Sequence, residues 1–242
     1  CALAAPVGGR WRMLTGDELG VLLADDALRH GRSGTYACSV VSSTMLGELA
    51  TAHGQPFAIT LTGFKWIGRV PGLAFGYEEA IGYCTDPDAV ADKDGISTLT
   101  RVLALVAALK AEGSTVQGRL DEIARTHGVH LTAPLSFRVS DLSLISDGMA
   151  RLRANGIASL AGSPVVVAQD LAEGSPELPP TDGLLYITEA DDRVIVRPSG
   201  TEPKLKCYLE AVLPCDGDEV PRAAAAERLD RIRADVTAAL GF

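Results

Sequence analysis

The pattern of apolar positions changes several times along the 242-residue chain, and each change predicts a different element. Leucines at helical spacing, preceded by acids and followed by a glycine, predict a helix over residues 15–31. A β-rich run at 35–43, a helix at 44–53 and a strand at 56–68 follow in that order. This order of strand, helix and strand is typical of an α/β domain.

The middle of the chain continues the same alternation. Residues 72–95 predict a strand followed by an acidic loop. Apolar side chains at 96–109 cover so much of the next helix that we expect it to be mostly buried. A capping-box pattern at 114–117 opens a further helix, which ends near Gly128.

The last hundred residues mix short strands with a helix. Residues 133–143 are interpreted as a connector, and a proline-rich loop at 173–183 cannot join a central strand or a helix interior. The C-terminal helix begins at Pro221, carries one apolar stripe and stops at Gly241. The predicted strands are 164–170, 183–200, with a hairpin turn at Asp191-Asp192, and 204–214.

These elements predict an α/β fold class with three parts. Residues 1–32 contain a hairpin that turns at Gly8-Gly9 and a helix, and they are interpreted as the tail of a preceding α/β domain. Residues 33–135 form a complete mixed-sheet α/β domain, and residues 136–242 form a linker and a small α+β domain. Because the chain opens inside a hairpin, we interpret it as the C-terminal part of a longer protein.

Composition and charge exclude several classes of partner. The net charge is −9 and no stripe of Lys or Arg is present, which argues against binding nucleic acid or an anionic membrane surface. No apolar run reaches membrane-spanning length. The 5 cysteines are scattered and include no CxxC pair, which favours reduced thiols in a cytoplasmic protein.

The segment RPSGTEPKLK, residues 197–206, concentrates groups that bind phosphate. A guanidinium can grip two phosphate oxygens, hydroxyls donate hydrogen bonds, and a glycine lets successive backbone N–H groups surround an anion as a nest. The residues concerned are Arg197, Ser199, Gly200, Thr201, Lys204 and Lys206. The two lysines share a face by strand alternation. The alternative interpretation is a solvated hairpin in which Ser, Gly and Thr serve only the turn.

Two motifs carry a resemblance to a known family. RPSGTEPK resembles the phosphate-binding signature in the C-terminal domain of the α-D-phosphohexomutase superfamily, the phosphoglucomutases and phosphomannomutases. GYEEAIGY, residues 76–83, resembles the sugar-binding loop of the third domain, in the form of the branch that includes phosphopentomutases. TGFKWIG and DKDGIS match other loops of that domain in the family's order. The resemblance covers the whole chain and implies a C-terminal domain like the TATA-box-binding protein.

The resemblance also implies roles for particular residues. Glu78 contacts sugar hydroxyls, whereas its neighbour Glu79 faces the other way in an extended segment. Ala80 stands where many relatives have Ser, so one hydroxyl contact is lost and the sugar preference stays open. Lys93 resembles a lysine that approaches the reacting phosphate. The loop near the sugar contains Thr62, Gly63 and Lys65. The alternatives are an exposed strand-end acid for Glu78, a snorkelling side chain for Lys65 and a helix-start charge for Lys93.

The resemblance implies a mutase that interconverts hexose 1-phosphate and hexose 6-phosphate through a bisphosphorylated sugar. Its phosphoserine and its Mg²⁺ ligands are expected upstream of Cys1, in N-terminal domains of the same protein. The chain alone is therefore expected to be inactive, with the socket at Arg197 binding the non-reacting phosphate of the phosphosugar. Phosphopentomutase activity and a non-catalytic phosphosugar-binding module remain alternatives.

Two other patterns suggest metal binding but do not complete a site. The aspartates at 86–94 have spacings loosely like those of a calcium loop, but the bidentate acid and the glycine pattern are lacking. The pair of histidines in HGVH, residues 127–130, has no Cys or carboxylate beside it. We therefore predict no metal site within the chain.

Overall fold

Two separate hydrophobic cores organise the chain. The computed structural model describes residues 1–242 and divides them into one unit of Cys1–His127 and a second of Gly128–Phe242. The larger buried cluster of the first unit runs from Ala5 to Ile123, and that of the second unit runs from Val139 to Leu240. Each unit is described by itself below.

The first unit is built on a four-stranded sheet. Its strands are β3 (Thr35–Ser39), β4 (Phe57–Thr60), β5 (Leu73–Glu78) and β6 (Gly82–Cys84). They lie in the order β4-β3-β5-β6; β3 pairs in parallel with β4 and β5, and β6 is antiparallel to β5. The carboxyl ends of the three parallel strands therefore meet at one edge of the sheet.

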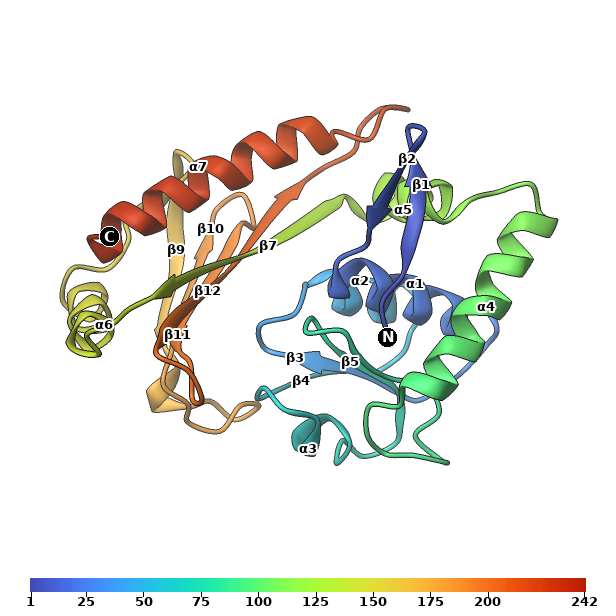
Figure 1. The fold of residues 1–242 in the computed structure, drawn as a ribbon, viewed down its shortest axis with the longest axis horizontal. Coiled ribbons are helices and arrows are strands. Elements are labelled where there is room, and N and C mark those ends of the chain that lie inside the picture. Colours follow the sequence, from blue (N-terminus) through green and yellow to red (C-terminus); the bar gives the residue numbers. More distant parts are fainter. The chain divides into compact units, whose positions relative to one another are not determined.

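Helices cover both faces of this sheet. They are α1 (Gly16–Arg29), α2 (Met45–Ala52), α3 (Phe64–Ile67), α4 (Gly95–Ala111) and α5 (Val116–His127). Figure 1 shows α1 and α2 on one side of the sheet and α3 on the other. Leu22 and Leu46 pack with Phe75 in the larger core, while Phe64 and Ile67 pack on the opposite face. The unit is thus a three-layered α/β/α domain.

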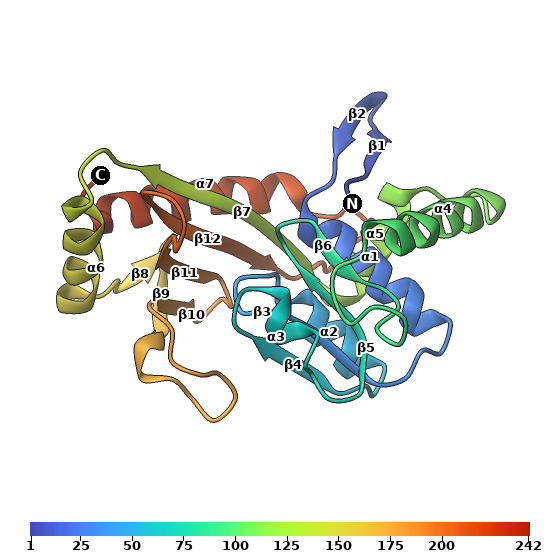
Figure 2. The same cartoon turned by 60° about the horizontal axis from the view of Figure 1, so that its bottom comes forward.

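A hairpin precedes α1, as predicted. It consists of β1 (Ala4–Val7) and β2 (Arg10–Met13), joined by Gly8 and Gly9, which both have positive φ. Figure 2 shows this hairpin extending beyond α1 and α5. The Thr15 side chain and Glu18 form a reciprocal capping box at the start of α1.

The second unit is one antiparallel sheet with helices. Its elements are β7 (Val129–Arg138), α6 (Ser143–Asn155), β8 (Ser159–Leu160), β9 (Ser163–Asp170), a 3₁₀ turn at Leu171–Glu173, β10 (Leu184–Thr188), β11 (Arg193–Pro198), β12 (Lys204–Leu213) and α7 (Arg222–Leu240). The strand order is β7-β12-β11-β10-β9-β8. Figure 1 shows α7 lying along the sheet, where its stripe of Leu229, Ile232 and Val236 is buried. The prediction of an α/β domain followed by an α+β domain is confirmed.

The compact units do not divide where the sequence patterns placed the boundaries. The predicted boundaries fall after residues 32 and 135, whereas the units meet between His127 and Gly128. Helix α1 contributes Leu19, Leu22 and Leu23 to the core of the first unit. Strand β7 pairs with β12 along its whole length, so it belongs to the second sheet.

Two predicted elements are wrong in part, and one element was missed. The connector at 133–143 lies mostly in β7, whose outer position in the sheet tolerates Pro134. The following helix α6 was not predicted. The strand predicted over 56–68 ends at Thr60, because Gly63 turns the chain with a φ of 108° and the short helix α3 follows.

Helix α4 is less buried than its pattern predicts. Val102, Leu105 and Leu109 are buried, but Ile96 is 79% exposed and Leu103 is 61% exposed. The apolar surface of this helix is wider than the area that the core of its own unit covers. None of the helices combines the length and the apolar character needed to cross a lipid bilayer.

Candidate functional site

The carboxyl end of β5 carries the acid that the sequence places at a sugar-binding loop. The Glu78 Oε1 atom accepts a hydrogen bond of 2.5 Å from the backbone N–H of Gly63, and Glu78 pairs with Gly82 across the hairpin. The positive φ of Gly63 sets the direction of that N–H group. Glu78 and the loop after β4 are therefore joined directly, although they are 15 residues apart in the sequence.

Lys93 lies beside the same loop. Its Nζ atom lies 5.4 Å from the centre of the Phe64 ring and 3.3 Å from Asp92 Oδ1. A Cβ atom at Gly82 would lie 3.2 Å from Cδ of Lys93, so this glycine makes room for the lysine stem. The structure thus brings Gly63, Glu78 and Lys93 into one neighbourhood.

The other residues predicted for this site have fewer interactions with Glu78 and its neighbours. Thr62 is half-buried beside Gly63, and Lys65 is exposed with its Nζ atom 5.7 Å from the centre of the Trp66 ring. Ala80 is exposed in the turn between β5 and β6, next to Ile81 with its positive φ. No contact in the structure joins Lys65 or Ala80 to Glu78.

Glu79 points away from Glu78, as strand alternation predicts. Its Oε2 atom accepts hydrogen bonds from Ser39 Oγ at 3.1 Å and Ser42 Oγ at 3.4 Å. Its backbone N–H donates to Ser42 Oγ at 3.2 Å. Burial raises the pKa of the Glu79 carboxyl and the charge of Asp17 adds to this effect, while the Ser39 hydrogen bond opposes it.

The contacts of Glu79 were not predicted from the sequence. The signal for them is the set of serines at the end of β3 and directly after it, because the ends of the neighbouring parallel strands β3 and β5 lie side by side. The serines at this end are almost fully buried. The first residue of α1 also packs here: a Cβ atom at Gly16 would lie 1.8 Å from the carbonyl oxygen of Glu79. Glu79 therefore fixes the end of β5 from one side while Glu78 faces the other.

In the second unit, the predicted phosphate loop joins β11 to β12. Arg197 lies directly opposite Lys206 in the antiparallel register. Lys206 has no ion-pair partner in the structure, whereas Lys204 is paired with Glu202 at 2.5 Å, and Glu202 also pairs with Arg138 at 3.1 Å. The buried residues of β12 alternate with these lysines, which confirms that Lys204 and Lys206 share a face. Arg197 and Lys206 thus lie side by side next to the loop.

The loop itself is open. The Ser199 N–H donates to the Lys204 carbonyl at 2.9 Å and closes the turn. No residue from 199 to 203 has a positive φ, so the loop contains no nest of the kind that alternates right- and left-handed residues. A Cβ atom at Gly200 would meet nothing within 4 Å. Gly200 and Thr201 are exposed, and a ligand can approach them freely.

The acidic loop before α4 does not suit a metal ion. Asp94 caps α4 by accepting hydrogen bonds from the N–H groups of Ile96 and Ser97, which lowers its pKa. Asp92 is paired with Lys93. No group of three or more His, Cys, Asp or Glu side chains in the structure could hold a metal ion. The residues of this chain therefore do not fit the Mg²⁺ that the family resemblance implies.

The structure thus contains an α/β/α domain with an acid at its strand ends and an α+β domain with a cationic loop. Two family models match the chain: the alpha/beta/alpha domain III of phosphoglucomutase/phosphomannomutase over residues 15–127, and the C-terminal domain over residues 149–238. The chain therefore belongs to the phosphoglucomutase/phosphomannomutase family, in the α-D-phosphohexomutase superfamily. The domain III match includes α1, in agreement with its place in the first core.

Individual relatives agree with this membership. A probable phosphomannomutase from Haemophilus influenzae is 44% identical over 90% of this chain and 46% of its own length. A phosphopentomutase from mouse is 31% identical over 85% of this chain and 38% of its own length. The chain thus spans less than half the length of these relatives. The solved structure of pp63/parafusin, a phosphoglucomutase from Paramecium, superposes with a TM-score of 0.73 at 19% identity, covering 95% of this chain and 43% of its own; it supports the fold.

Proposed function

We propose that this chain is the sugar- and phosphate-binding part of a phosphosugar mutase. The complete enzyme interconverts hexose 1-phosphate and hexose 6-phosphate through a bisphosphorylated sugar. Family membership and the mutases among the relatives support this activity. In this proposal the phosphoserine and the Mg²⁺ ligands belong to parts of the protein outside these residues. The enzyme acts in the cytoplasm.

The observation that carries the proposal is the pair of cations at the phosphate loop. Like charges directly opposite each other on neighbouring strands destabilise a sheet. Arg197 and Lys206 occupy such a position beside Ser199 and Thr201. A bound phosphate dianion offsets this repulsion, because it accepts charge-assisted hydrogen bonds from the guanidinium and the ammonium together. The hydroxyls of Ser199 and Thr201 supply further donors.

Glu78 is suited to hold the sugar. One of its oxygens is used by the Gly63 N–H, and a carboxylate has capacity for several more hydrogen bonds, which neighbouring sugar hydroxyls can donate. Lys93, whose Nζ atom lies 5.4 Å from the centre of the Phe64 ring, and Lys65 on the same loop can neutralise charge on the phosphate that reacts. Thr62 adds a hydroxyl to the same loop.

Phosphoryl transfer depends mostly on positioning and electrostatic stabilisation. The socket at Arg197 holds the phosphate that is not reacting, in both orientations of the bisphosphorylated sugar. Binding energy from this remote group orients the reacting end. Loss of Arg197 should consequently lower turnover as well as affinity. The 242-residue chain alone should convert no sugar phosphate, since this proposal places the phosphoserine and the Mg²⁺ ligands outside it.

The kinetic test uses the full-length enzyme with Arg197→Ala. We expect kcat/KM for glucose 1-phosphate to fall about 100-fold, because two charge-assisted hydrogen bonds are lost. The matched control is Arg231→Ala, which removes an exposed guanidinium from α7 and should change kcat/KM less than about twofold. Equal effects of the two substitutions, or a loss confined to KM, would contradict the proposed role of Arg197.

Phosphopentomutase activity is the second candidate. Ala80 lacks the hydroxyl that the family resemblance implies at this position in many relatives, and phosphopentomutases from mouse and human are among the relatives at 31% identity. Pocket size and hydroxyl contacts, not phosphate chemistry, choose between the sugars. Comparison of kcat/KM for the 1-phosphates of glucose, mannose, ribose and deoxyribose decides between the candidates. We expect a hexose to give the highest value, and a pentose with the highest value would establish the alternative.

A further inference from the structure

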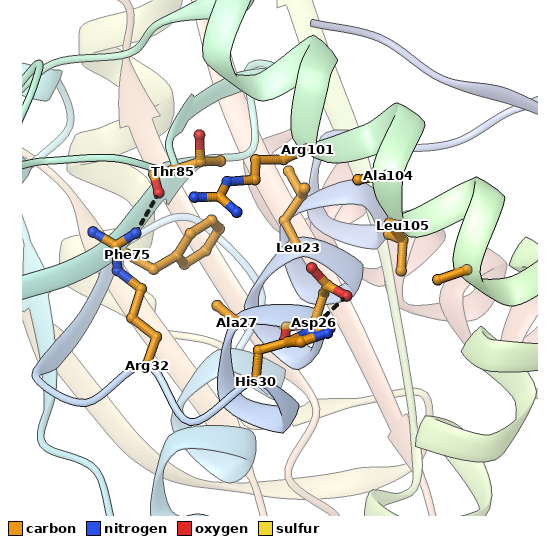
Figure 3. A pocket seen from close by; sticks show the side chains of 11 residues that line it. Leu23, Asp26, Ala27, His30, Arg32, Phe75, Thr85, Arg101, Ala104 and Leu105 are labelled. Carbon is orange, nitrogen blue, oxygen red and sulfur yellow. Dashed lines mark hydrogen bonds and ion pairs between the residues drawn. The ribbon is translucent and has the colours of Figure 1, made fainter.

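The first unit contains a pocket that the proposed function does not use. Its volume is about 460 Å³, within the range of small-molecule sites. It lies between the second half of α1, the middle of α4, Phe75 of β5 and Thr85, which directly follows β6 (Figure 3). The lining residues are Leu23, Asp26, Ala27, His30, Arg32, Phe75, Thr85, Arg101, Ala104, Leu105 and Ala108.

This pocket is separate from the proposed sugar site. Phe75 lies in the first half of β5, whereas Glu78 is its last residue. Helix α1 begins against Glu79 and reaches the pocket only with its second half; its 14 residues span about 21 Å. None of the lining residues belongs to the sugar loop or to the phosphate loop.

The interior of the pocket is apolar and one end is cationic. The floor consists of the side chains of Leu23, Leu105 and Phe75, with three alanines around them. Figure 3 shows the guanidinium groups of Arg32 and Arg101 on either side of the Phe75 ring, near Thr85. This arrangement places hydrogen-bond donors next to a flat apolar surface.

The two guanidinium groups retain donors for a ligand. Arg32 donates one hydrogen bond of 2.9 Å to the Thr85 carbonyl. Its other terminal nitrogen lies 3.8 Å from Asp86 and 3.9 Å from Asp88, which is longer than a hydrogen bond. Arg101 has no hydrogen bond or ion pair in the structure, so all five of its N–H groups remain available.

The acid in the pocket, Asp26, already interacts with His30. The His30 Nδ1 atom contacts the Asp26 carbonyl oxygen at 2.8 Å and the Asp26 carboxylate at 3.4 Å. Burial raises the pKa of Asp26, while the charges of His30, Arg29 and Arg101 partly oppose this effect. Asp26 and His30 therefore pair with each other at one side, and the arginines face the remaining space.

We propose that this pocket binds a small organic anion with a flat apolar body and a single phosphate or carboxylate group. The apolar body packs on Phe75 and on the alanines of α4, and the anionic group lies between Arg32 and Arg101. Guanidinium groups bind both kinds of anion through paired hydrogen bonds. A sugar phosphate fits less well, because the floor offers few partners for sugar hydroxyls. The inference does not depend on the mutase activity.

The test is a titration of the 242-residue chain with phenyl phosphate and with benzoate, followed by backbone amide NMR. We expect saturable shifts at Ala27, Thr85 and Ala104, with a Kd below about 10 mM for at least one probe. The probe with the lower Kd shows whether the pocket prefers a phosphate or a carboxylate group. Neutral benzyl alcohol should bind at least about tenfold more weakly, since it cannot pair with the guanidinium groups.

Three variants separate the pocket from unspecific attraction. Arg101→Ala should weaken binding of the anionic probe about tenfold or more. Lys110→Ala removes one exposed charge from the same helix outside the pocket and should leave binding unchanged. Ala104→Leu should block the site by filling it, with the helix preserved.

Any of three results would overturn the proposal. The first is the absence of saturable shifts around the pocket with both anions. The second is equal weakening by Arg101→Ala and Lys110→Ala, and the third is equal binding of benzyl alcohol and the anions; each of these two would show that the arginines do not recognise the anion.

Discussion

At the scale of single residues, the adjacent acids Glu78 and Glu79 illustrate how one step along the chain gives two carboxylates different partners. Glu78 faces the Gly63 loop, and Glu79 faces the serines that follow β3. The alternation of side chains was sufficient to predict this divergence. The partners were not predictable, because they depend on which strands become neighbours. Likewise, the residue types of residues 197–206 predict a phosphate-binding loop, but they do not predict the backbone conformation of Gly200.

Glu79 should make stability depend on pH. Its pKa is raised above 4.5 in the folded state by burial, so the folded protein binds this proton more tightly than the unfolded chain. The contribution is favourable below the unfolded pKa and is lost as the pH rises through the folded pKa. Glu79→Gln removes this dependence, and the free energy of unfolding of the variant should fall less between about pH 4 and pH 7.

Urea unfolding at a series of pH values measures this effect. Glu48→Gln, at an exposed position of α2, serves as the control and should keep the pH dependence of the wild type. If Glu79→Gln and the wild type show parallel stability curves over the whole range, burial does not raise the pKa of Glu79.

At the scale of elements, helices with a strong apolar pattern in the sequence were predicted well. The amphipathic stripe of α7 and the leucines of α1 identified these helices with boundaries close to those observed. Strand β7 was missed because Pro134 and the polar residues around it resemble a loop, and its pairing with β12 joins segments more than 60 residues apart. Short α3 was missed because the turn at Gly63 depends on the sheet beneath it. Local sequence does not contain such information.

The turn between β10 and β11 provides a prediction at this scale. Asp192 is fully buried there, and its carboxylate accepts hydrogen bonds from Arg228 of α7, with Nε at 2.7 Å from Oδ2. It also accepts one from the Val212 N–H at 3.3 Å. Arg228→Ala leaves a buried carboxylate without its cation and should destabilise the protein by about 3 kcal/mol.

Chemical denaturation followed by circular dichroism checks this value. Arg231→Ala, on the same helix but exposed, should change the free energy of unfolding by less than about 0.5 kcal/mol. Similar values for the two variants would mean that the contact between Asp192 and Arg228 does not stabilise the second unit.

At the scale of the whole molecule, the chain consists of two units, and each contains one of the predicted loops. The first unit carries Glu78 at the end of β5, and the second carries Arg197 and Lys206 beside the loop between β11 and β12. The sequence motifs predict a role for each loop, because each motif is short and local. The boundary between the units was harder to predict from the sequence, since it depends on long-range packing of α1 and on the pairing of β7. The pocket between α1 and α4 was not predictable at all, because its residues come from four distant segments.

The most direct test of the central claim is binding of glucose 1-phosphate to the 242-residue chain, mapped by backbone amide NMR. We predict that the largest shifts fall on residues 197–206, and that Arg197→Ala raises the Kd about tenfold or more. Arg231→Ala and Arg101→Ala should bind as the wild type does. Shifts that leave residues 197–206 unchanged, or an Arg197→Ala variant with wild-type affinity, would contradict the assignment of this loop as the phosphate socket.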